Sequence, residues 1–421
     1  MTADNRVTIS LPEDILGFIP HALGHRPKES LVAITLRGQT LGATLRVDLP
    51  PDRSERVLAV YSRRIAEYLD ADHDADGALL AVFSDDGWED GGVVRGNVPL
   101  LEALELVLAR RGLALRDAWF IGSDYWRSAF CTDVACCPIP GRPVDQILDS
   151  RLNAEMVFRG SSVKESPRLL RPEDQPAVDP EFLSAEAATL EEMLRRWKSK
   201  KTFEEMLDVW TRVLDSGLPE EIDLEAAAFL RASLRVPAWR DAVVVLAAAG
   251  RGVARGGAEA FRFFSPESDD EEALLIPPGL RPLSQAAGTS PAAGKGHGAS
   301  GGKPPRTAAA DINALRYGDV LLGLYPDNPD WERLTALDLV LARLSRRGGG
   351  EGRAAALTIR GWIQWCQGSG SFADEFFSRA DAEQQGYRLA ELLSEVVQRG
   401  TVCGWAKSRT SAWRKFGGAA A

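Results

Sequence analysis

Apolar residues recur along the first 130 positions in two alternating patterns. Short runs rich in β-branched residues are typical of strands, and longer runs with apolar positions every three to four residues are typical of helices. The predicted strands cover residues 7–11, 30–37, 40–49, 78–84 and 114–122.

The segments between these strands determine how the strands are connected. Gly38-Gln39 is a two-residue connection with glycine first, which suits a type II′ turn and makes its flanking strands antiparallel. Residues 52–69 and 98–108 have helical periodicity and can cross over between parallel strands. The sequence therefore predicts an α/β N-terminal half, built as a mixed, largely parallel three-layer sandwich.

The strand pattern disappears from about residue 180, and the remaining apolar runs have helical spacing. The predicted helices cover residues 185–197, 202–214, 224–234, 241–254, 331–346, 354–366, 372–380 and 387–399. We therefore expect an all-α C-terminal half. Between its two parts lies a stretch of Gly, Ser, Pro and Ala with too few large apolar groups to offset the entropy of ordering. The predicted organisation is an α/β domain (1–175), a helical region (180–262), a disordered linker (265–308), a second helical region (309–403) and a basic flexible tail (404–421).

Composition narrows the class of protein. The chain has 421 residues, 45% of them hydrophobic, and a formal charge of −10. Such a chain can bury a full core, and its charge repels phosphate backbones, which makes nucleic acid an improbable partner. The N-terminal residues lack an export signal, and no apolar run could span a membrane. An odd number of cysteines, five, does not suggest a secreted disulfide framework, so we expect a cytoplasmic protein.

Three of the cysteines lie close together in the motif Cys131-x4-Cys136-Cys137-Pro138. Thiolates can ligate zinc or attack electrophiles, and Cys131 could form a reversible disulfide with either of the other two. Zinc sites normally use paired C-x2-C motifs, vicinal cysteines rarely bind one ion together, and no fourth ligand is nearby in sequence. We therefore assign no metal. Packed, inert cysteines are the interpretation we favour, and thiol chemistry stays open.

A second candidate site follows from the strand order. Ligands of open α/β sheets collect beyond the carboxyl ends of parallel strands. Those ends carry polar side chains here, and a polar segment precedes the cysteines. The candidate ligand-binding residues are Arg46, Asp48, Asp85, Asp124, Trp126, Arg127 and Ser128. The alternative is ordinary turn and helix-capping chemistry, for which Asp and Ser are the usual residues.

The sequence also contains a partial match to a calcium-binding loop, which we reject. Asp72-x-Asp74-x-Asp76-Gly77 matches the opening of an EF-hand loop, but Phe83 occupies the position that needs a bidentate glutamate. A polar turn between a helix and a strand explains the same residues. We also find no phosphate-binding loop and no nucleophile elbow, so no catalytic residue and no cofactor can be assigned.

Several stretches resemble a known family. They are Leu23-Gly24-His25-Arg26-Pro27, Arg46-Val47-Asp48-Leu49-Pro50, and the cysteine motif together with Trp126, Gly141 and Pro143. On these residues the chain resembles the actinobacterial domain-of-unknown-function family four-one-nine-two. The resemblance implies a bacterial, cytoplasmic setting, and it implies no activity, because none is assigned to that family.

Two classes of function stay open. The first is a non-catalytic ligand-sensing or protein-interaction protein, in which the C-terminal helices would contact a protein partner. The second is an enzyme that uses the cysteines, or Asp48, Asp85 and Asp124 with a metal ion, in a crevice at the strand ends. The absence of recognisable catalytic motifs favours the first class.

Overall fold

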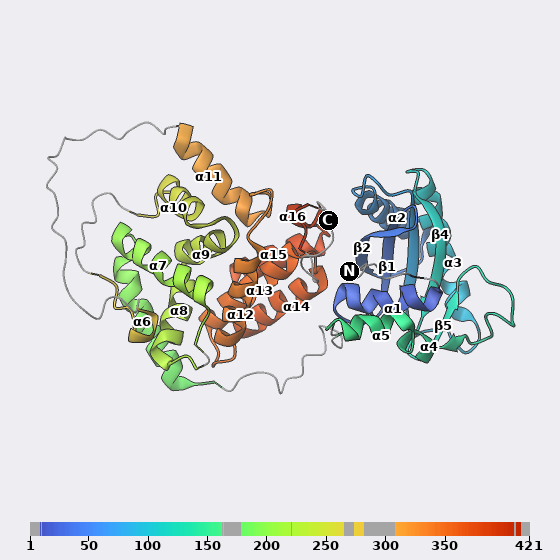
Figure 1. Cartoon of the computed structure of the whole chain (residues 1–421), viewed down its shortest axis with the longest axis horizontal. Helices are drawn as coiled ribbons and strands as arrows, with labels where there is room; N and C mark the ends of the chain where they lie inside the picture. Colours follow the sequence, from blue (N-terminus) through green and yellow to red (C-terminus); the bar gives the residue numbers. More distant parts are fainter. Residues whose placement is uncertain are drawn as a thin grey trace, which may run out of the picture. The chain divides into compact units, whose positions relative to one another are not determined.

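The computed structural model describes residues 9, 11–161, 163, 178–219, 221–264, 273–281, 308–407 and 410–413. The chain divides into two compact units, with the boundary between residues 169 and 170. Figure 1 shows a sheet with helices in the first unit and helices alone in the second. Each unit is described by itself below.

The first unit contains one six-stranded sheet with the strand order β2-β1-β3-β4-β5-β6. The strands are β1 Ser30–Arg37, β2 Thr40–Asp48, β3 Gly77–Phe83, β4 Ala114–Ile121, β5 Tyr125–Ser128 and β6 Arg142–Pro143. The four longer strands agree with their predicted ranges to within one residue at each end. Of the strand predicted over residues 7–11, the structure describes only residues 9 and 11, and neither lies in a strand.

The sheet is mixed, as predicted, but the expectation of a largely parallel sheet is wrong. Only β3 and β4 pair in parallel, and the other four pairings are antiparallel. The cause is the β1–β2 hairpin, which places β1 between β2 and β3. Gly38 in its turn has a φ of 59°, the positive value that glycine supplies in a type II′ turn. Both predicted crossover helices do join strands that run in the same direction, because β2 and β3 are each antiparallel to β1.

Helices cover both faces of this sheet, which gives three layers. The helices are α1 Pro12–Leu23, α2 Glu55–Leu69, α3 Gly92–Ala109, α4 Asp145–Leu148 and α5 Arg151–Phe158. Leu58 of α2 and Leu104 of α3 belong to one apolar core with Leu80 of the sheet, whereas Leu16 of α1 packs with Leu79 on the opposite face. Alternate residues of β3 therefore point into two separate cores, as the period of a strand requires.

The second unit is all helical in its described residues, as predicted. Its helices are α6 Pro180–Arg196, α7 Lys200–Ser216, α8 Leu224–Leu234, α9 Pro237–Ala249, α10 Arg251–Ala260, the 3-10 turn Pro278–Leu280, α11 Ala308–Leu321, α12 Trp331–Leu344, α13 Glu351–Cys366, α14 Gly370–Glu383, α15 Arg388–Gln398 and α16 Gly404–Lys407. The single helix predicted over residues 241–254 is two helices, because Gly250, at a φ of 83°, ends α9.

Short polar side chains cap the N-termini of several of these helices. Asp179, Ser199, Asp223 and Asp330 each accept a hydrogen bond from a backbone N–H in the first turn of α6, α7, α8 and α12. Such caps satisfy donors that the helix cannot pair internally. Apolar residues between the caps form one core cluster that extends from Phe182 to Trp405.

A buried ion pair lies inside this helical core. The side chains of Arg231 and Glu186 are 0% and 1% exposed, and their charged groups are 2.8 Å apart. Arg231 also donates hydrogen bonds to the backbone carbonyls of Arg347, Gly348 and Gly349. The guanidinium therefore holds the loop between α12 and α13 against α8.

The spans predicted as linker and tail lie only partly within the described residues. Inside the predicted linker, residues 273–281 lie against the helical core, and Leu274 and Leu280 are both buried. At the start of the predicted tail, Trp405 of α16 is buried between other tryptophans. No helix in the described part of the chain is long and apolar enough to cross a membrane.

Candidate functional site

The three clustered cysteines lie on the segment that joins β5 to β6, residues 129–141, which we call the thiol loop. Its ends are fixed because Tyr125 pairs with Pro143 and Trp126 pairs with Arg142. Gly141 permits this pairing, since a Cβ there would lie 2.9 Å from the carbonyl oxygen of Trp126. The glycine of the sequence motif thus allows the loop to return tightly to the sheet.

Asp133 organises the turn inside the thiol loop. Its carbonyl oxygen accepts hydrogen bonds from the backbone N–H groups of Cys136, at 3.1 Å, and Cys137, at 2.7 Å. Its Oδ1 accepts a third hydrogen bond from the N–H of Ala135 at 2.8 Å. Aspartate commonly closes turns in this way. The turn folds the vicinal cysteines back toward Cys131.

The fold therefore brings the three thiols together. The sulfur atoms of Cys131, Cys136 and Cys137 all lie within 4.8 Å of one another. They are unequally exposed, because Cys137 is buried, Cys131 is partly buried and Cys136 is exposed. Among the residues that the structure describes, they form the one group of three or more side chains placed to hold a metal ion.

Arg142 is the cation of this cluster, and the sequence alone did not single it out. Its Nη2 donates to the sulfur of Cys136 at 3.3 Å, and its Nε donates to the carbonyl oxygen of the same residue at 2.7 Å. Glu13 of α1 holds it through an ion pair of 3.1 Å, and its guanidinium lies 5.3 Å from the centroid of the Trp126 ring. A guanidinium held on three sides presents a fixed positive charge to the thiols.

The surroundings shift the acidity of two of the thiols in opposite directions. Hydrogen bonding with the backbone of Asp133, and then with the side chain of Cys137, lowers the pKa of Cys131 below its ordinary value. Burial raises the pKa of Cys137. The cluster therefore contains thiols that differ in how readily they ionise, which is a property of reactive cysteine groups.

At the carboxyl ends of the parallel strands β3 and β4, the expected residue Asp85 meets two further polar residues. Ser123 donates a hydrogen bond of 2.7 Å from its Oγ to Oδ1 of Asp85. Glu29, which sequence reasoning missed, accepts from the backbone N–H of Asp85 at 3.0 Å. Glu29 has a φ of 40°, which is uncommon for a residue other than glycine. No sequence pattern signals this conformation.

The other candidate residues at this edge are not brought to the same point. Asp48 is 58% exposed and forms an ion pair of 2.7 Å with Arg46, on its own strand. The strand β1 separates Asp48 from Asp85, and two strand spacings amount to about 9.6 Å. The backbone carbonyl of Asp124 accepts from the N–H of Val144. The three aspartates therefore do not form one close cluster.

The polar segment before the cysteines belongs to β5. Trp126 is buried in the core beneath α1, and Arg127 is also buried. The Oγ of Ser128 accepts a hydrogen bond from the N–H of Phe130 at 3.3 Å. These residues precede the thiol loop directly; Trp126 and Arg127 are closed to solvent, and Ser128 is partly exposed.

The aspartates of the rejected calcium loop have structural contacts. Asp72 accepts hydrogen bonds from the side chains of Thr35 and Arg37. Asp76 accepts from the backbone N–H of Gly38 at 2.8 Å. Both carboxylates thus tie the turn before β3 to the β1–β2 hairpin, in keeping with the interpretation as a polar turn.

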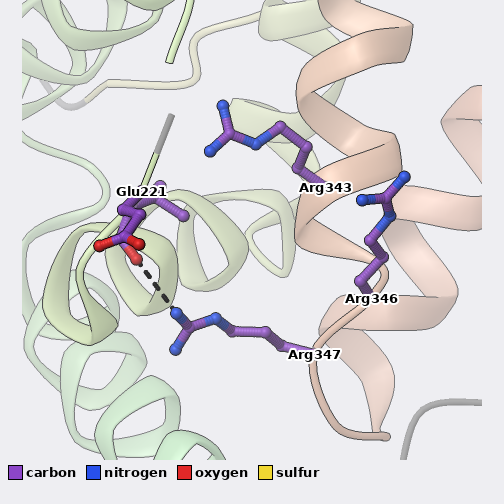
Figure 2. Close-up of a pocket in the computed structure, with 5 residues that line it drawn as sticks. Glu221, Arg343, Arg346 and Arg347 are labelled. Carbon is purple, nitrogen blue, oxygen red and sulfur yellow. Dashed lines mark hydrogen bonds between the residues drawn. The ribbon is translucent and has the colours of Figure 1, made fainter. Parts of the chain in front are cut away.

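A basic pocket occurs in the helical unit, at the end of α12. Figure 2 shows Arg343, Arg346 and Arg347 around it, with Glu221 opposite, and its volume is about 420 Å³. Arg343 donates to the carbonyl oxygens of Leu218 and Pro219, and Arg347 donates to that of Ile222. Two of the three guanidinium groups are therefore engaged in fixing the segment before α8.

A comparison with protein-family models gives one match. The model described as Domain of unknown function (DUF4192) matches residues 12–263 and 319–402. These residues include the thiol loop and most of the helical unit. Comparisons with curated proteins and with solved structures give no match.

Proposed function

The chain belongs to the DUF4192 family, and on that premise we propose that it is a non-catalytic sensor whose responsive element is the thiol loop. The observation that carries the proposal is the meeting of three sulfur atoms within 4.8 Å on an accessible loop. The remaining cysteines, Cys366 and Cys403, are fully buried in the helical unit. Exposure thus separates the thiol loop, where Cys131 and Cys136 are accessible, from the inert pair Cys366 and Cys403.

The position of the cluster suits sensing better than catalysis. Enzymes that act on small molecules usually enclose them in a concave pocket. Cys136 instead lies exposed on a loop between two short strands. A thiol in that position can react with a diffusing oxidant, and a new bond within the loop would change the shape of an exposed surface.

The chemistry that we propose is reversible disulfide formation with a peroxide as oxidant. The Cys136 thiolate, next to Arg142, attacks one peroxide oxygen, which breaks the O–O bond and releases hydroxide. The thiol of Cys131 then attacks the resulting sulfenic sulfur, and the hydroxyl group leaves as water. The two thiols lose two hydrogens, and the peroxide is reduced to two waters. A thiol reductant reverses the reaction.

The test is to treat the reduced full-length protein with a mild excess of hydrogen peroxide and to map its disulfides by mass spectrometry. Proteolytic cleavage on the N-terminal side of Asp133 separates Cys131 from Cys136, so a disulfide between these two cysteines joins two peptides. We expect one such bond per chain, with Cys366 and Cys403 still reduced as an internal control.

Two variants sharpen this test. Cys136→Ser should prevent the bond, whereas Cys137→Ala should leave it intact. If the native protein forms no bond, or forms one only after unfolding or only between chains, the thiol loop is not a redox sensor.

A further inference from the structure

We propose that in the reduced protein the thiolates of Cys131, Cys136 and Cys137 together hold one thiophilic divalent metal ion of the zinc class. The inference rests on the proposed function in one respect, because it uses the same thiols as the responsive element. It deepens that function by naming the ligand of the reduced state. It also revises the expectation from the sequence, which assigned no metal because vicinal cysteines rarely bind one ion.

The spacing of the sulfur atoms carries the inference. Tetrahedral zinc binds thiolates at about 2.3 Å, which places the sulfur atoms about 3.8 Å apart. The three sulfur atoms here already lie within 4.8 Å of one another. Rotation of the exposed side chain of Cys136 can close the remaining difference, since the loop backbone is held by Asp133 and by the pairing of β5 with β6.

The charge of the site favours a divalent ion. Three thiolates and one divalent cation leave a net charge of minus one. Arg142, whose Nη2 lies 3.3 Å from the sulfur of Cys136, supplies the balancing positive charge. Hydrogen bonds from neighbouring groups to metal-bound ligands generally strengthen binding. Calcium and magnesium do not fit the site, because they require oxygen ligands.

Three protein ligands leave one position of a tetrahedral ion open. Structural zinc sites usually close all four positions with protein ligands, whereas open sites keep water or an exchangeable ligand in the fourth. Because Cys136 is exposed, solvent can reach a metal ion bound to it. The site therefore suits a metal ion that can be lost or exchanged, as a sensor requires. Disulfide formation would remove two of the three ligands and release the ion.

The experiment uses the reduced full-length protein, freed of metal with a chelator and titrated with Co²⁺. Cobalt is a spectroscopic substitute for zinc, because its absorption reports both thiolate ligation and tetrahedral geometry. We expect one Co²⁺ per chain, with a sulfur-to-cobalt charge-transfer band and tetrahedral ligand-field bands. Added Zn²⁺ should bleach both.

Matched variants assign the ligands. The double variant Cys131→Ser, Cys136→Ser changes no fully buried residue and should weaken binding by at least about 100-fold. Arg142→Met should weaken it by about 10-fold to 100-fold, as expected for a group that supports a ligand, and Arg142→Lys should restore part of the loss. Glu105→Gln, at an exposed position of α3, is the control and should bind normally. Circular dichroism checks that each variant is folded.

The outcomes separate the two proposals. A six-coordinate, oxygen-type spectrum, no stoichiometric uptake, or unchanged binding in the double cysteine variant would overturn the metal site. If the metal site fails while peroxide still forms the Cys131–Cys136 bond, the proposed redox function stands. If metal binds to the thiols and peroxide forms no bond, the metal site stands and the redox function falls.

Discussion

Cys136 in the α/β unit is exposed, whereas Cys366 and Cys403 in the helical unit have no exposed surface. The same contrast holds for one arginine of each unit. Arg142 is partly exposed and donates to a thiol, but Arg231 is fully buried and donates to three backbone carbonyls. One unit presents its reactive side chains on a loop, and the other encloses them among helices.

This difference has an energetic reason. A buried charge must be completely paired, because desolvation costs several kcal/mol per ion. The Nη1 and Nη2 groups of Arg231 are already engaged by protein groups, and only its Nε is without a hydrogen-bond partner among the described residues. On an exposed loop the cost of desolvation is small, so Arg142 can contact either a thiol or a thiolate. The reactivity of a residue in this protein follows from its burial more than from its type.

The largest effect that we expect concerns the enclosed arginine. Arg231→Met removes the nearest cation from the buried Glu186, which keeps Arg235 at 3.5 Å, and it leaves the carbonyls of Arg347, Gly348 and Gly349 without their donor. The free energy of unfolding, measured by chemical denaturation, should fall by about 3–5 kcal/mol.

The control for this variant is Arg388→Met, because Arg388 is 77% exposed in its ion pair with Glu391. Its effect should stay within about 0.5 kcal/mol. Adding Glu186→Gln to Arg231→Met should recover part of the loss, since it removes a buried charge that Arg235 alone would pair. A loss below about 1 kcal/mol for Arg231→Met would mean that the helical unit does not depend on enclosed charge.

A smaller effect is expected in the α/β unit, at Asp72. Burial alone would raise the pKa of this carboxyl, but hydrogen bonds from Thr35, Arg37 and the backbone of Ala43 hold it below its usual value. Asp72→Asn weakens charge-assisted bonds and should cost about 1.5–3 kcal/mol near neutral pH.

The pH dependence of this difference has a defined sign. A carboxyl with a lowered pKa in the folded state stabilises the protein above its unfolded pKa of about 3.9, and the stabilisation is lost as the pH falls through the folded value. The stability gap between the native protein and Asp72→Asn should therefore narrow below about pH 4. Asp74→Asn, at an exposed position of the same turn, should show no gap at any pH. A gap that widens in acid would contradict this assignment.

Much of this fold could be predicted from local patterns. The strands β1 to β4 and most helices of the second unit, α11 and α16 excepted, have the apolar periodicity that predicts them, and Gly38 identifies the hairpin. The mostly antiparallel pairing of the strands could not be predicted, because it depends on β1 lying between β2 and β3. The pairing of β1 with β3 joins residues that are distant in the sequence. The strand β6 has only two residues, Arg142 and Pro143, and carries no detectable period.

The site was predicted less well, for a related reason. The cysteines were identified by their spacing, but their meeting depends on a turn centred on Asp133 and on Gly141. The expected group of Asp48, Asp85 and Asp124 was inferred from parallel strand ends, and the inserted strand β1 separates Asp48 from Asp85. Arg142 becomes a neighbour of Cys136 only through the pairing of β5 with β6.

The smallest effects that we expect come from replacing one cysteine by serine in each unit. The two variants compare the units directly, because the substitution is the same in both. Cys366→Ser places a hydroxyl in an apolar interior beside Cys403, and burial raises the pKa of the Cys366 thiol well above its ordinary value. The substitution should cost about 1–3 kcal/mol of unfolding free energy. Cys136→Ser places the same hydroxyl on the exposed thiol loop and should change stability by less than about 0.5 kcal/mol.

The two variants should also differ in thiol reactivity. With a chromogenic thiol reagent, the native protein should show fast reaction at Cys131 and Cys136, slow reaction at Cys137, and none at Cys366 and Cys403 until it unfolds, because burial limits access of the reagent. Cys136→Ser should remove one fast thiol, whereas Cys366→Ser should remove none. Equal losses of stability, or a fast thiol lost from Cys366→Ser, would show that burial does not divide the cysteines into a reactive group and an inert pair.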